Sequence, residues 1–288
     1  MPVIELSDVT DPRLGDYRHV PDPELLRRGE IFVAEGREVV RTLISRSPYP
    51  VRSVLLTETA FRALAGVIQP RLAELTVFVV PSGSIETLTG YNIHRGCLAI
   101  GERPPRRSLS ALLLETPAGS GATRGVSADR CHPTTASRLV ILEGVGNADN
   151  MGGVFRNAAA FGADLVVLGP RCCDPLYRKA IRVSMGASLR VPFAHAEEGW
   201  PEALGELREA GFQVLALTPD PRAGDLGVAA AAAPPRVALL AGSEGDGLTA
   251  AALAASDRLV RIPMAPGTDS LNVATAVGIA LHRLFGQA

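Results

Sequence analysis

Short, uninterrupted apolar runs recur through the second half of this chain and alternate with longer segments of mixed polarity. The run at 139–142 contains no polar residue, which is typical of a strand covered on both faces of a sheet. Five further, mostly apolar runs predict strands at 165–168, 190–193, 213–217, 237–241 and 259–262, and the segments between and after them predict helices at 152–161, 177–184, 200–210 and 271–284. Strands that alternate with helices in this way indicate an α/β fold with a mostly parallel sheet.

A smaller set of the same elements precedes this region, in residues 1–106. A strand is expected to end at 32–36 and others to span 51–56, 75–80 and 97–100, with helices at 37–45, 59–65 and 84–88 and a short helix behind a possible cap at Asp22. This pattern predicts a second, smaller α/β unit.

The stretch between these two regions has a different composition. A short helix is expected within 103–114, whereas 115–137 is rich in glycine, serine, threonine, alanine and proline and shows no hydrophobic periodicity. Such a composition indicates a flexible linker or a surface insertion. We therefore divide the chain into a first domain at 1–106, a linker or insertion at 107–137 and a second domain at 138–288.

Composition and charge are those of a soluble globular protein. Of the 288 residues, 47% are hydrophobic and 20% are charged, and the formal net charge of −1 gives no overall signal for a nucleic-acid partner. Lys179 is the only lysine among 29 basic residues. A GC-rich genome would explain that bias, although arginine is also the better residue for bidentate phosphate contacts.

The cysteines and the hydropathy pattern indicate in which cellular compartment the protein is expected. The four cysteines form no Cys-x-x-Cys pair, so we expect a reduced, cytoplasmic protein without a structural metal. Residues 1–11 lack the basic and apolar regions of a signal peptide. No apolar run reaches the length of about 18 residues that a membrane span needs, so no membrane partner is expected.

The first polar cluster follows the strand at 139–142 and leads into a helix. Gly144 and Gly146 begin a G-x-G pattern that is not completed, and the lysine of a phosphate-binding P-loop is missing. A nucleotide-binding loop is therefore not indicated. Arg156 lies one to two turns into an otherwise apolar helix, either as a surface arginine or as a functional group.

Two further clusters follow the last two predicted strands. The glycines between Gly242 and Leu248 allow a ligand to approach the backbone, and Glu244 lies at the tip of this loop. The alternative is a loop that only turns the chain. Before the final helix, Ser270 or Asp269 would act as a cap, whereas Asn272 is expected within the first turn, where an apolar residue would cost less.

Because all three clusters follow predicted strands, we expect them to meet at one edge of the sheet and form one pocket. That pocket would contain Asn150, Arg156, Glu244, Ser270 and Asn272. The motifs show no Ser-His-Asp order, no paired acids and no set of metal ligands, and the five histidines lie outside them. Hydrolysis by a nucleophilic triad is therefore not expected.

The three clusters resemble, in order and separation, the three motifs of the SpoU (TrmH) family of RNA ribose 2′-O-methyltransferases, which belongs to the SPOUT class. The residues that carry the resemblance are Asn150-Met-Gly-Gly-Val-Phe-Arg156, Gly242-Ser-Glu-Gly-Asp-Gly-Leu248, and Ile262-Pro-Met with Ser270-Leu-Asn-Val. The match covers residues 138–286. In the first domain, 32–36 and 90–96 resemble the substrate-binding domain of the family's ribosomal RNA members.

This resemblance implies a fold and a cofactor that the residues alone do not. The fold is an α/β SPOUT domain whose chain forms a deep trefoil knot around S-adenosylmethionine, together with a smaller N-terminal α/β substrate-binding domain. The resemblance also implies that the active form is a homodimer. Backbone groups at or near five positions would hold the cofactor: Leu240, Gly242, Ile262, Met264 and Leu271.

Carried over by position, Arg156 would act on the ribose 2′-hydroxyl, from the neighbouring subunit. Asn150, Glu244, Ser270 and Asn272 would position that arginine, the cofactor and the RNA phosphate. A guanidinium is a poor base. Two roles for Arg156 therefore stay open: it loses its proton in a special environment, or it stabilises a developing alkoxide.

The substrate that the resemblance implies is ribosomal RNA, whose 2′-hydroxyl distinguishes it from DNA. Phosphate contacts are expected from Arg95, Arg103, Arg106 and Arg107. Three alternatives stay open: a methyltransferase of tRNA, a non-catalytic knotted RNA-binding assembly factor, and an enzyme that protects the ribosome from an antibiotic. The intact motif residues argue against the non-catalytic alternative.

Overall fold

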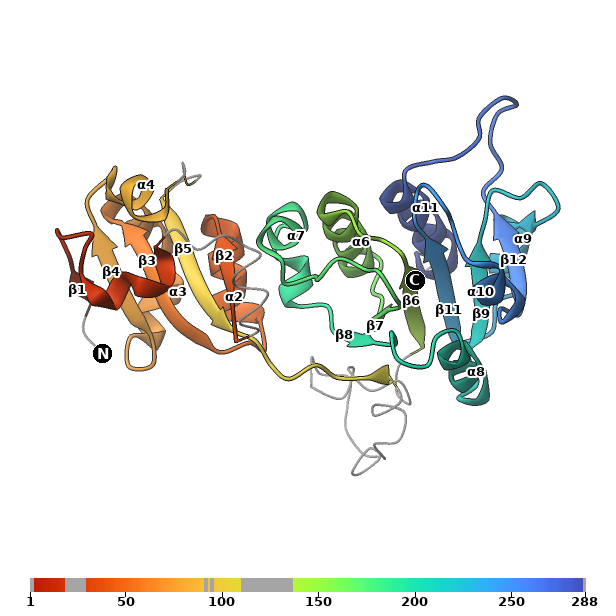
Figure 1. The fold of residues 1–288 in the computed structure, drawn as a ribbon, viewed down its shortest axis with the longest axis horizontal. Helices are drawn as coiled ribbons and strands as arrows, with labels where there is room; N and C mark the ends of the chain where they lie inside the picture. Colours follow the sequence, from red (N-terminus) through yellow and green to blue (C-terminus); the bar gives the residue numbers. More distant parts are fainter. Residues whose placement is uncertain (1–2, 19–29, 91–92, 94–95, 110–136, 287–288) are drawn as a thin grey trace. The chain divides into compact units, whose positions relative to one another are not determined.

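The chain forms two compact units, which are described separately. The computed structural model describes residues 3–18, 30–90, 93, 96–109 and 137–286. The first unit comprises Met1–Pro105 and Asp174–Arg190, and the second comprises Arg106–Cys173 and Val191–Ala288 (Figure 1). The helix expected behind Asp22 and residues 115–136 of the linker lie outside the described residues, as do residues 110–114 of the segment expected to contain a short helix.

The first unit is an α/β structure with a five-stranded sheet. Its elements are β1 (Ile4–Glu5), η1 (Pro12–Tyr17), β2 (Ile31–Glu35), α2 (Arg37–Arg46), β3 (Val51–Thr57), α3 (Glu58–Ile68), η2 (Gln69–Arg71), β4 (Thr76–Val80), α4 (Ser84–Thr89) and β5 (Cys97–Glu102). The strand order is β1-β4-β3-β5-β2. β1, β4 and β3 are parallel, whereas β5 is antiparallel to both β3 and β2. The strands predicted for this region are all present, with ends that differ by at most two residues.

Helix α7 (Arg178–Val183) and the short 3-10 helix η4 (Ala187–Leu189) also belong to the first unit. Two ion pairs hold this segment in place. Arg103 lies 2.6 Å from Asp174, and Arg178 lies 3.3 Å from Glu35, whose side chain is only 3% exposed. Residues 174–190 therefore pack with the first unit although the sequence analysis assigned them to the domain at 138–288. The functional division of the chain into domains stays a prediction.

The second unit carries a seven-stranded, wholly parallel sheet in the order β10-β12-β9-β11-β6-β7-β8. Its elements are β6 (Arg138–Glu143), α6 (Ala148–Ala160), β7 (Leu165–Leu168), β8 (Phe193–His195), α8 (Glu202–Glu209), β9 (Gln213–Leu217), β10 (Gly224–Asp225), α9 (Leu226–Ala231), β11 (Val237–Gly242), α10 (Ala250–Ala254), β12 (Arg258–Arg261) and α11 (Val273–Phe285). This confirms the predicted α/β fold with a mostly parallel sheet. The trefoil knot stays a prediction.

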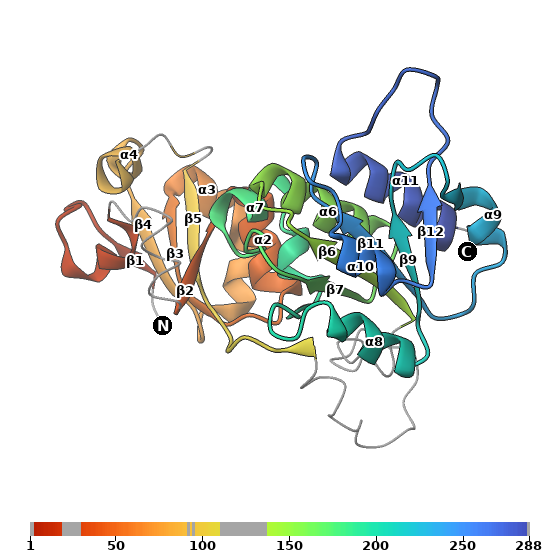
Figure 2. The same ribbon diagram turned by 45° about the vertical axis from the view of Figure 1, so that its right-hand side comes forward.

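Helices cover both faces of this sheet. Residues of α8 and α10 share one apolar core with alternate residues of the central strands, including Leu139 and Ile141. α6 and α11 pack against each other on the opposite side from α8 (Figure 2). Their contact is close, because a Cβ atom on Gly153 would lie 2.7 Å from the Cβ of Ala274. Asn157 Nδ2 also donates to the Ala274 carbonyl oxygen at 2.7 Å.

Some boundaries differ from the predictions for physical reasons. α6 begins four residues before the predicted start at 152, because Asn147 caps it by accepting hydrogen bonds from the amides of Asp149 and Asn150. The strand predicted at 190–193 begins only at Phe193, because the Arg190 amide still closes the turn of η4. β10, α9 and α10 were not predicted, since they are short and their sequences have no clear periodicity.

Candidate active site

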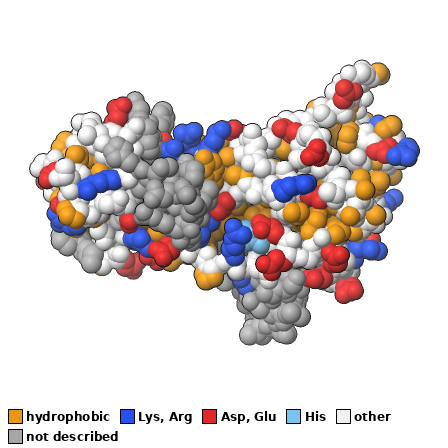
Figure 3. Space-filling view, viewed as in Figure 1, with side chains coloured by type: hydrophobic (Ala, Val, Ile, Leu, Met, Phe, Trp, Pro, Cys, Tyr) orange, Lys and Arg blue, Asp and Glu red, His pale blue; other side chains and the backbone are white. Residues whose placement is uncertain are grey.

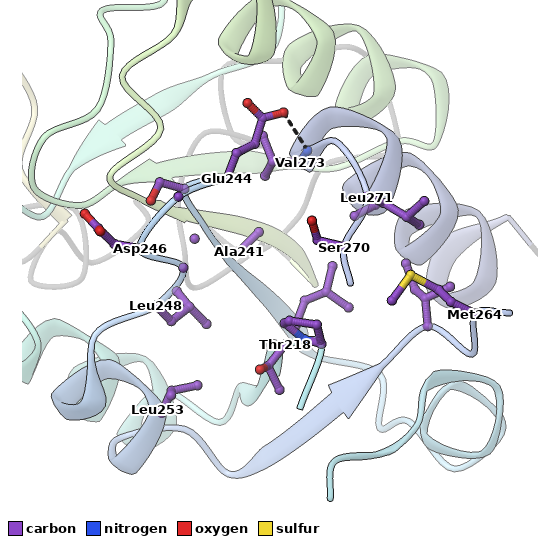
Figure 4. Close-up of a pocket in the computed structure, with 18 residues that line it drawn as sticks. Thr218, Ala241, Glu244, Asp246, Leu248, Leu253, Met264, Ser270, Leu271 and Val273 are labelled. Atoms are coloured by element: carbon purple, nitrogen blue, oxygen red, sulfur yellow. Dashed lines mark hydrogen bonds between the residues drawn. The ribbon is translucent and has the colours of Figure 1, made fainter. Parts of the chain in front are cut away.

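A cavity of about 370 Å³ lies at the carboxyl-terminal edge of the second unit's sheet. The chain segments that follow β9, β11 and β12 form its walls, together with the start of α11 (Figure 4). Because parallel strands all end at the same edge, this is the place where such sheets bind ligands. The lining residues are Leu217, Thr218, Pro219, Ala241 to Leu248, Leu253, Ile262, Met264, Ser270, Leu271, Val273 and Ala276.

The glycine-rich loop after β11 is folded tightly on itself. Ser243 and Gly247 form an isolated antiparallel bridge, which places Glu244 at the exposed turn. A Cβ atom on Gly242 would lie 2.4 Å from the carbonyl carbon of Gly247. Only glycine is therefore compatible with this close backbone approach at position 242. Gly247 itself has a φ of +68°, a conformation that favours glycine.

Asn272 joins the three sequence motifs through its side chain. Its Oδ1 accepts a hydrogen bond from the Thr275 amide at 3.1 Å and so caps α11. That bond fixes the orientation of the amide group. Its Nδ2 consequently donates to Asn150 Oδ1 at 2.8 Å and to Glu244 Oε1 at 2.5 Å. Glu244 Oε1 also accepts from the Val273 amide at 3.4 Å (Figure 4).

This network corrects one expectation about the third motif. The sequence analysis named Ser270 or Asp269 as the cap and placed Asn272 inside the first helical turn. The structure shows Asn272 as the cap, with α11 beginning at Val273. Ser270 is exposed and lines the cavity. Capping and a functional role are therefore not alternatives for Asn272, because its two amide atoms contact different partners.

Arg156 is not part of this network. It is exposed on α6 and does not line the cavity, and it has no hydrogen bond or ion pair with any described residue. It lies six positions after Asn150 on the helix, so the two side chains leave the helix about 120° apart. Asn150, by contrast, is 8% exposed and faces Asn272. Within one chain, the structure does not bring Arg156 to the other four predicted site residues.

Four of the five predicted cofactor-contacting residues line the cavity: Gly242, Ile262, Met264 and Leu271. Leu240 of β11 does not, because its side chain is fully buried in the apolar core that includes residues of α8 and α10. The sequence analysis did not assign to the site Leu217, the last residue of β9, or Thr218 and Pro219, which follow it. Their strand was predicted, but its position between β11 and β12 is a property of the strand order and has no local signal.

Glu143 is a second group that the sequence analysis did not single out. It lies at the end of β6, its side chain is fully buried, and it pairs in register with Gly242 of β11. Its carboxylate accepts hydrogen bonds from Trp200 Nε1 at 2.7 Å and from the amide and hydroxyl of Thr249, each at 2.9 Å. These donors replace water, so the buried acid connects β6 to the far end of the glycine-rich loop.

The Cys172 thiol, close to the end of β6, is not suited to nucleophilic chemistry. Cys172 is half-buried and its Sγ donates to the Leu142 carbonyl oxygen at 3.3 Å. Burial raises the pKa of the Cys172 thiol to about 11, so it stays protonated at neutral pH. Among the described residues, no group of three or more His, Cys, Asp or Glu side chains is arranged to hold a metal ion.

The arginines predicted to contact RNA are in different environments. Arg95 lies outside the described residues. Arg103 is 13% exposed and forms an ion pair with Asp174, which gives it a structural role. Arg106 lies 3.7 Å from Glu197, with both side chains largely in solvent. The Arg107 carbonyl accepts a hydrogen bond from the His195 amide at 2.8 Å. Contact of any of them with RNA stays a prediction.

This chain is similar to several known proteins. A model of the SpoU rRNA Methylase family matches residues 137–282. A protein of Mycobacterium tuberculosis, strain H37Rv, named an uncharacterized tRNA/rRNA methyltransferase, is 40% identical across 97% of this chain and 91% of its own length. The same identity and coverage hold for a protein of that name from Mycobacterium bovis.

Solved structures share the whole fold. A crystal structure of an RNA 2′-O ribose methyltransferase superposes with a TM-score of 0.70 at 26% identity and covers 99% of both chains. The AdoMet-bound rRNA methyltransferase of Sinorhizobium meliloti superposes with a TM-score of 0.75 at 24% identity, over 98% of this chain and 97% of that one. At 24% identity, the similarity to the Sinorhizobium meliloti enzyme shows a shared fold and nothing more.

Among the described residues, no helix has the length and apolar character needed to cross a bilayer.

Proposed function

The chain belongs to the SpoU rRNA Methylase family, and from that membership we propose that it transfers a methyl group from S-adenosylmethionine to a ribose 2′-hydroxyl of ribosomal RNA. The observation that carries the proposal is the Asn272 side chain, which connects Asn150 and Glu244 at the mouth of a preformed cavity. A helix cap alone would need only the Asn272 oxygen. The second amide atom instead holds two further polar residues beside the cavity.

The cavity suits a nucleoside with an amino-acid tail. Its volume is within the range of small-molecule sites, and its walls combine apolar side chains with exposed backbone groups. Ile262, Met264 and Leu271 would contact the adenine and ribose. Backbone groups around Gly242 can approach the ligand closely because position 242 has no side chain. When bound, S-adenosylmethionine supplies a sulfonium that makes its methyl group electrophilic.

The protein would align the cofactor with the RNA and control the proton of the target 2′-hydroxyl. Glu244 Oε1 is occupied by Asn272 and Val273, whereas Glu244 Oε2 has no partner among the described residues. Oε2 is therefore available to accept a hydrogen bond from the substrate. Asn272 holds Glu244 in place and is itself held by Asn150. Ser270 provides a hydroxyl on the segment before α11, which also lines the cavity (Figure 4).

We propose that Arg156 acts in the active site of a second copy of the chain, in a homodimer. Its exposure, its lack of a partner among the described residues and its direction away from Asn150 all fit a cation that acts on another subunit. At the target 2′-hydroxyl it would take the proton or stabilise the developing alkoxide. Both roles need the guanidinium within hydrogen-bond distance of the same oxygen.

The test combines mapping and reconstitution. Sites of 2′-O-methylation are mapped across total RNA from a wild-type strain and a strain that lacks the gene. The RNA that loses a site is then methylated in vitro with the purified protein. Loss of one ribosomal RNA site, restored in vitro, supports the proposal. Loss of a tRNA site would instead assign the enzyme to tRNA. If no site is lost and S-adenosylmethionine does not bind, the protein is a non-catalytic RNA-binding factor.

A further inference from the structure

Arg171 occupies an unusual backbone position beside the candidate active site. It follows Pro170 in the turn after β7 and has a φ of +58°. A turn that places proline before a left-handed residue favours glycine or asparagine at the second position. An arginine there costs conformational energy. The Arg171 side chain is exposed and has no hydrogen bond or ion pair with any described residue, so no internal contact of the side chain offsets that cost.

Backbone hydrogen bonds fix the Arg171 turn to the loop of the first motif. The Gly169 amide donates to the Leu142 carbonyl at 2.8 Å, and the Gly144 amide donates to the Pro170 carbonyl at 2.9 Å. On the other side of the turn, the Cys173 amide donates to the Val145 carbonyl at 2.8 Å. Arg171 is therefore held against the segment that leads into α6 and Asn150. The position of its Cα is set by the same backbone that forms the site.

The Arg171 guanidinium lies next to the glycine-rich loop of the second motif. A Cβ atom built on Gly144 would lie 3.8 Å from Arg171 Nη2 and 3.7 Å from Ser243 Oγ. Ser243 precedes Glu244 and lines the cavity. Arg171 itself does not line the cavity. Arg171 Nη2 and Ser243 Oγ thus both lie on the Cβ side of Gly144, and the guanidinium is close to the cavity without lining it.

The loops around this mouth carry exposed acids, namely Glu244, Asp246 and Asp269. Figures 1 and 3 show the segment between β12 and α11 projecting from the sheet, with acidic side chains on it and beside it. An RNA backbone that brings a ribose to this edge would meet their negative charge. A cation at the rim that has no partner among the described residues would offset that repulsion, and a guanidinium matches the geometry of phosphate oxygens.

We propose that Arg171 binds a backbone phosphate of the RNA next to the ribose that is methylated. The proposal rests on the proposed function, since it assumes that RNA enters at this edge. The carboxylate of S-adenosylmethionine is the other anion in the reaction. It belongs with the cofactor in the cavity, which Arg171 does not line. Arg171 is thus a substrate-positioning residue.

The Arg171→Asn variant tests this directly, because asparagine adopts the left-handed conformation readily and removes only the cation. We expect the KM for protein-free ribosomal RNA from a deletion strain to rise roughly tenfold. The kcat at saturating RNA and the affinity for S-adenosylmethionine should stay unchanged. The slope of log K for RNA binding against log salt should become shallower by roughly 0.7, the value for one phosphate contact in a single strand. The KM of the Arg171→Lys variant should lie between those of the wild-type protein and of Arg171→Asn.

The matched control is Arg258→Gln, which removes an equally exposed arginine at the opposite end of the sheet. It should leave the KM and the salt dependence at wild-type values. Arg171→Asn should melt at or above the wild-type temperature, since the substitution relieves backbone strain. A lower melting temperature with an unchanged KM would show that Arg171 has only a structural role. Weaker cofactor binding with an unchanged KM would assign Arg171 to the cofactor carboxylate and overturn the proposal.

A filter-binding assay with the same RNA separates this inference from the proposed function. If the wild-type protein binds RNA without methylating it, the proposed function fails, and a weaker, less salt-dependent complex of Arg171→Asn still supports the phosphate contact. If the wild-type protein methylates RNA and the variant binds RNA equally well, the proposed function stands and the role of Arg171 is refuted.

Discussion

Asn272 donates a hydrogen bond from Nδ2 to Asn150 Oδ1 at 2.8 Å, across 122 positions of the sequence. The contact connects the cap of α11 to the first turn of α6, the two helices that pack most closely in the second unit. Glu244 accepts a second hydrogen bond from the same nitrogen. One side-chain amide thus both begins a helix and fixes the polar groups at the mouth of the cavity.

Asn272→Asp separates these two roles. Aspartate is a good cap, so the helix and the melting temperature should be nearly unchanged. The variant loses the donor to Asn150 and places a carboxylate beside Glu244, so we expect methyl transfer to fall by a factor on the order of 100 or more. Thermal unfolding and initial rates with ribosomal RNA measure the two effects.

The control for Asn272→Asp is the loss of a cap elsewhere. Asp225 caps α9 by accepting from the amides of Gly227 and Val228. Asp225→Ala should cost about 1 kcal/mol of stability and leave the rate of methyl transfer intact. If Asn272→Asp is as active as the wild-type protein, the Asn272 donor has no role in the reaction.

Arg156→Ala should abolish methyl transfer and leave cofactor affinity close to the wild-type value, because Arg156 lies outside the cavity. A mixture of Arg156→Ala and Glu244→Ala chains tests whether Arg156 acts on the partner. Each homodimer is inactive, whereas a mixed dimer has one site with both groups if the arginine acts in trans. Random pairing should then restore about a quarter of wild-type activity. No recovery in verified mixed dimers would place Arg156 in the site of its own chain.

The sequence predicted the parts of this site that have local signals. The apolar run at 139–142 indicated a buried strand, and the polar residues after three strands were expected at one edge. The structure does bring Asn150, Glu244 and Asn272 together. The helix was predicted to begin at 152, whereas α6 begins at Ala148 because Asn147 caps it. Gly152 and Gly153 are helical, and Gly153 allows α11 to approach through Ala274.

Other features depend on contacts between distant residues. Thr218 and Pro219 reach the cavity only because β9 lies between β11 and β12, and no local pattern reveals a strand order. The packing of α7 on the first unit depends on an ion pair between Glu35 and Arg178, which are 143 positions apart. Arg171 likewise carries no sequence motif. Its backbone conformation, visible only in the structure, sets it apart from other exposed arginines.

Gly242→Ala should impair the cofactor cavity. The new Cβ atom would lie within 2.6 Å of three backbone atoms of Gly247 and Leu248, none of which can move like the end of a side chain. The loop must therefore shift, and we expect the affinity for S-adenosylmethionine to fall by about tenfold or more. Isothermal titration calorimetry measures the change.

Gly245→Ala is the matched control in the same loop. A Cβ atom at this position would have no neighbour within 4 Å, and its φ is not in the left-handed region. Its cofactor affinity should remain close to the wild-type value. Equal affinities for Gly242→Ala and Gly245→Ala would show that the tight turn at 242–247 does not shape the cofactor site.

Glu143→Gln should destabilise the second unit. The wild-type carboxylate accepts from Trp200 Nε1 and twice from Thr249, and glutamine presents an NH2 group where one carboxylate oxygen accepted. One buried donor then faces another donor, which costs about 1–3 kcal/mol. Because Thr249 follows the glycine-rich loop, cofactor affinity should fall as well.

The same replacement at Glu209, an exposed residue of α8, should change stability by less than about 0.5 kcal/mol. Identical urea unfolding of the two variants would show that the Glu143 contacts do not hold the loop to β6.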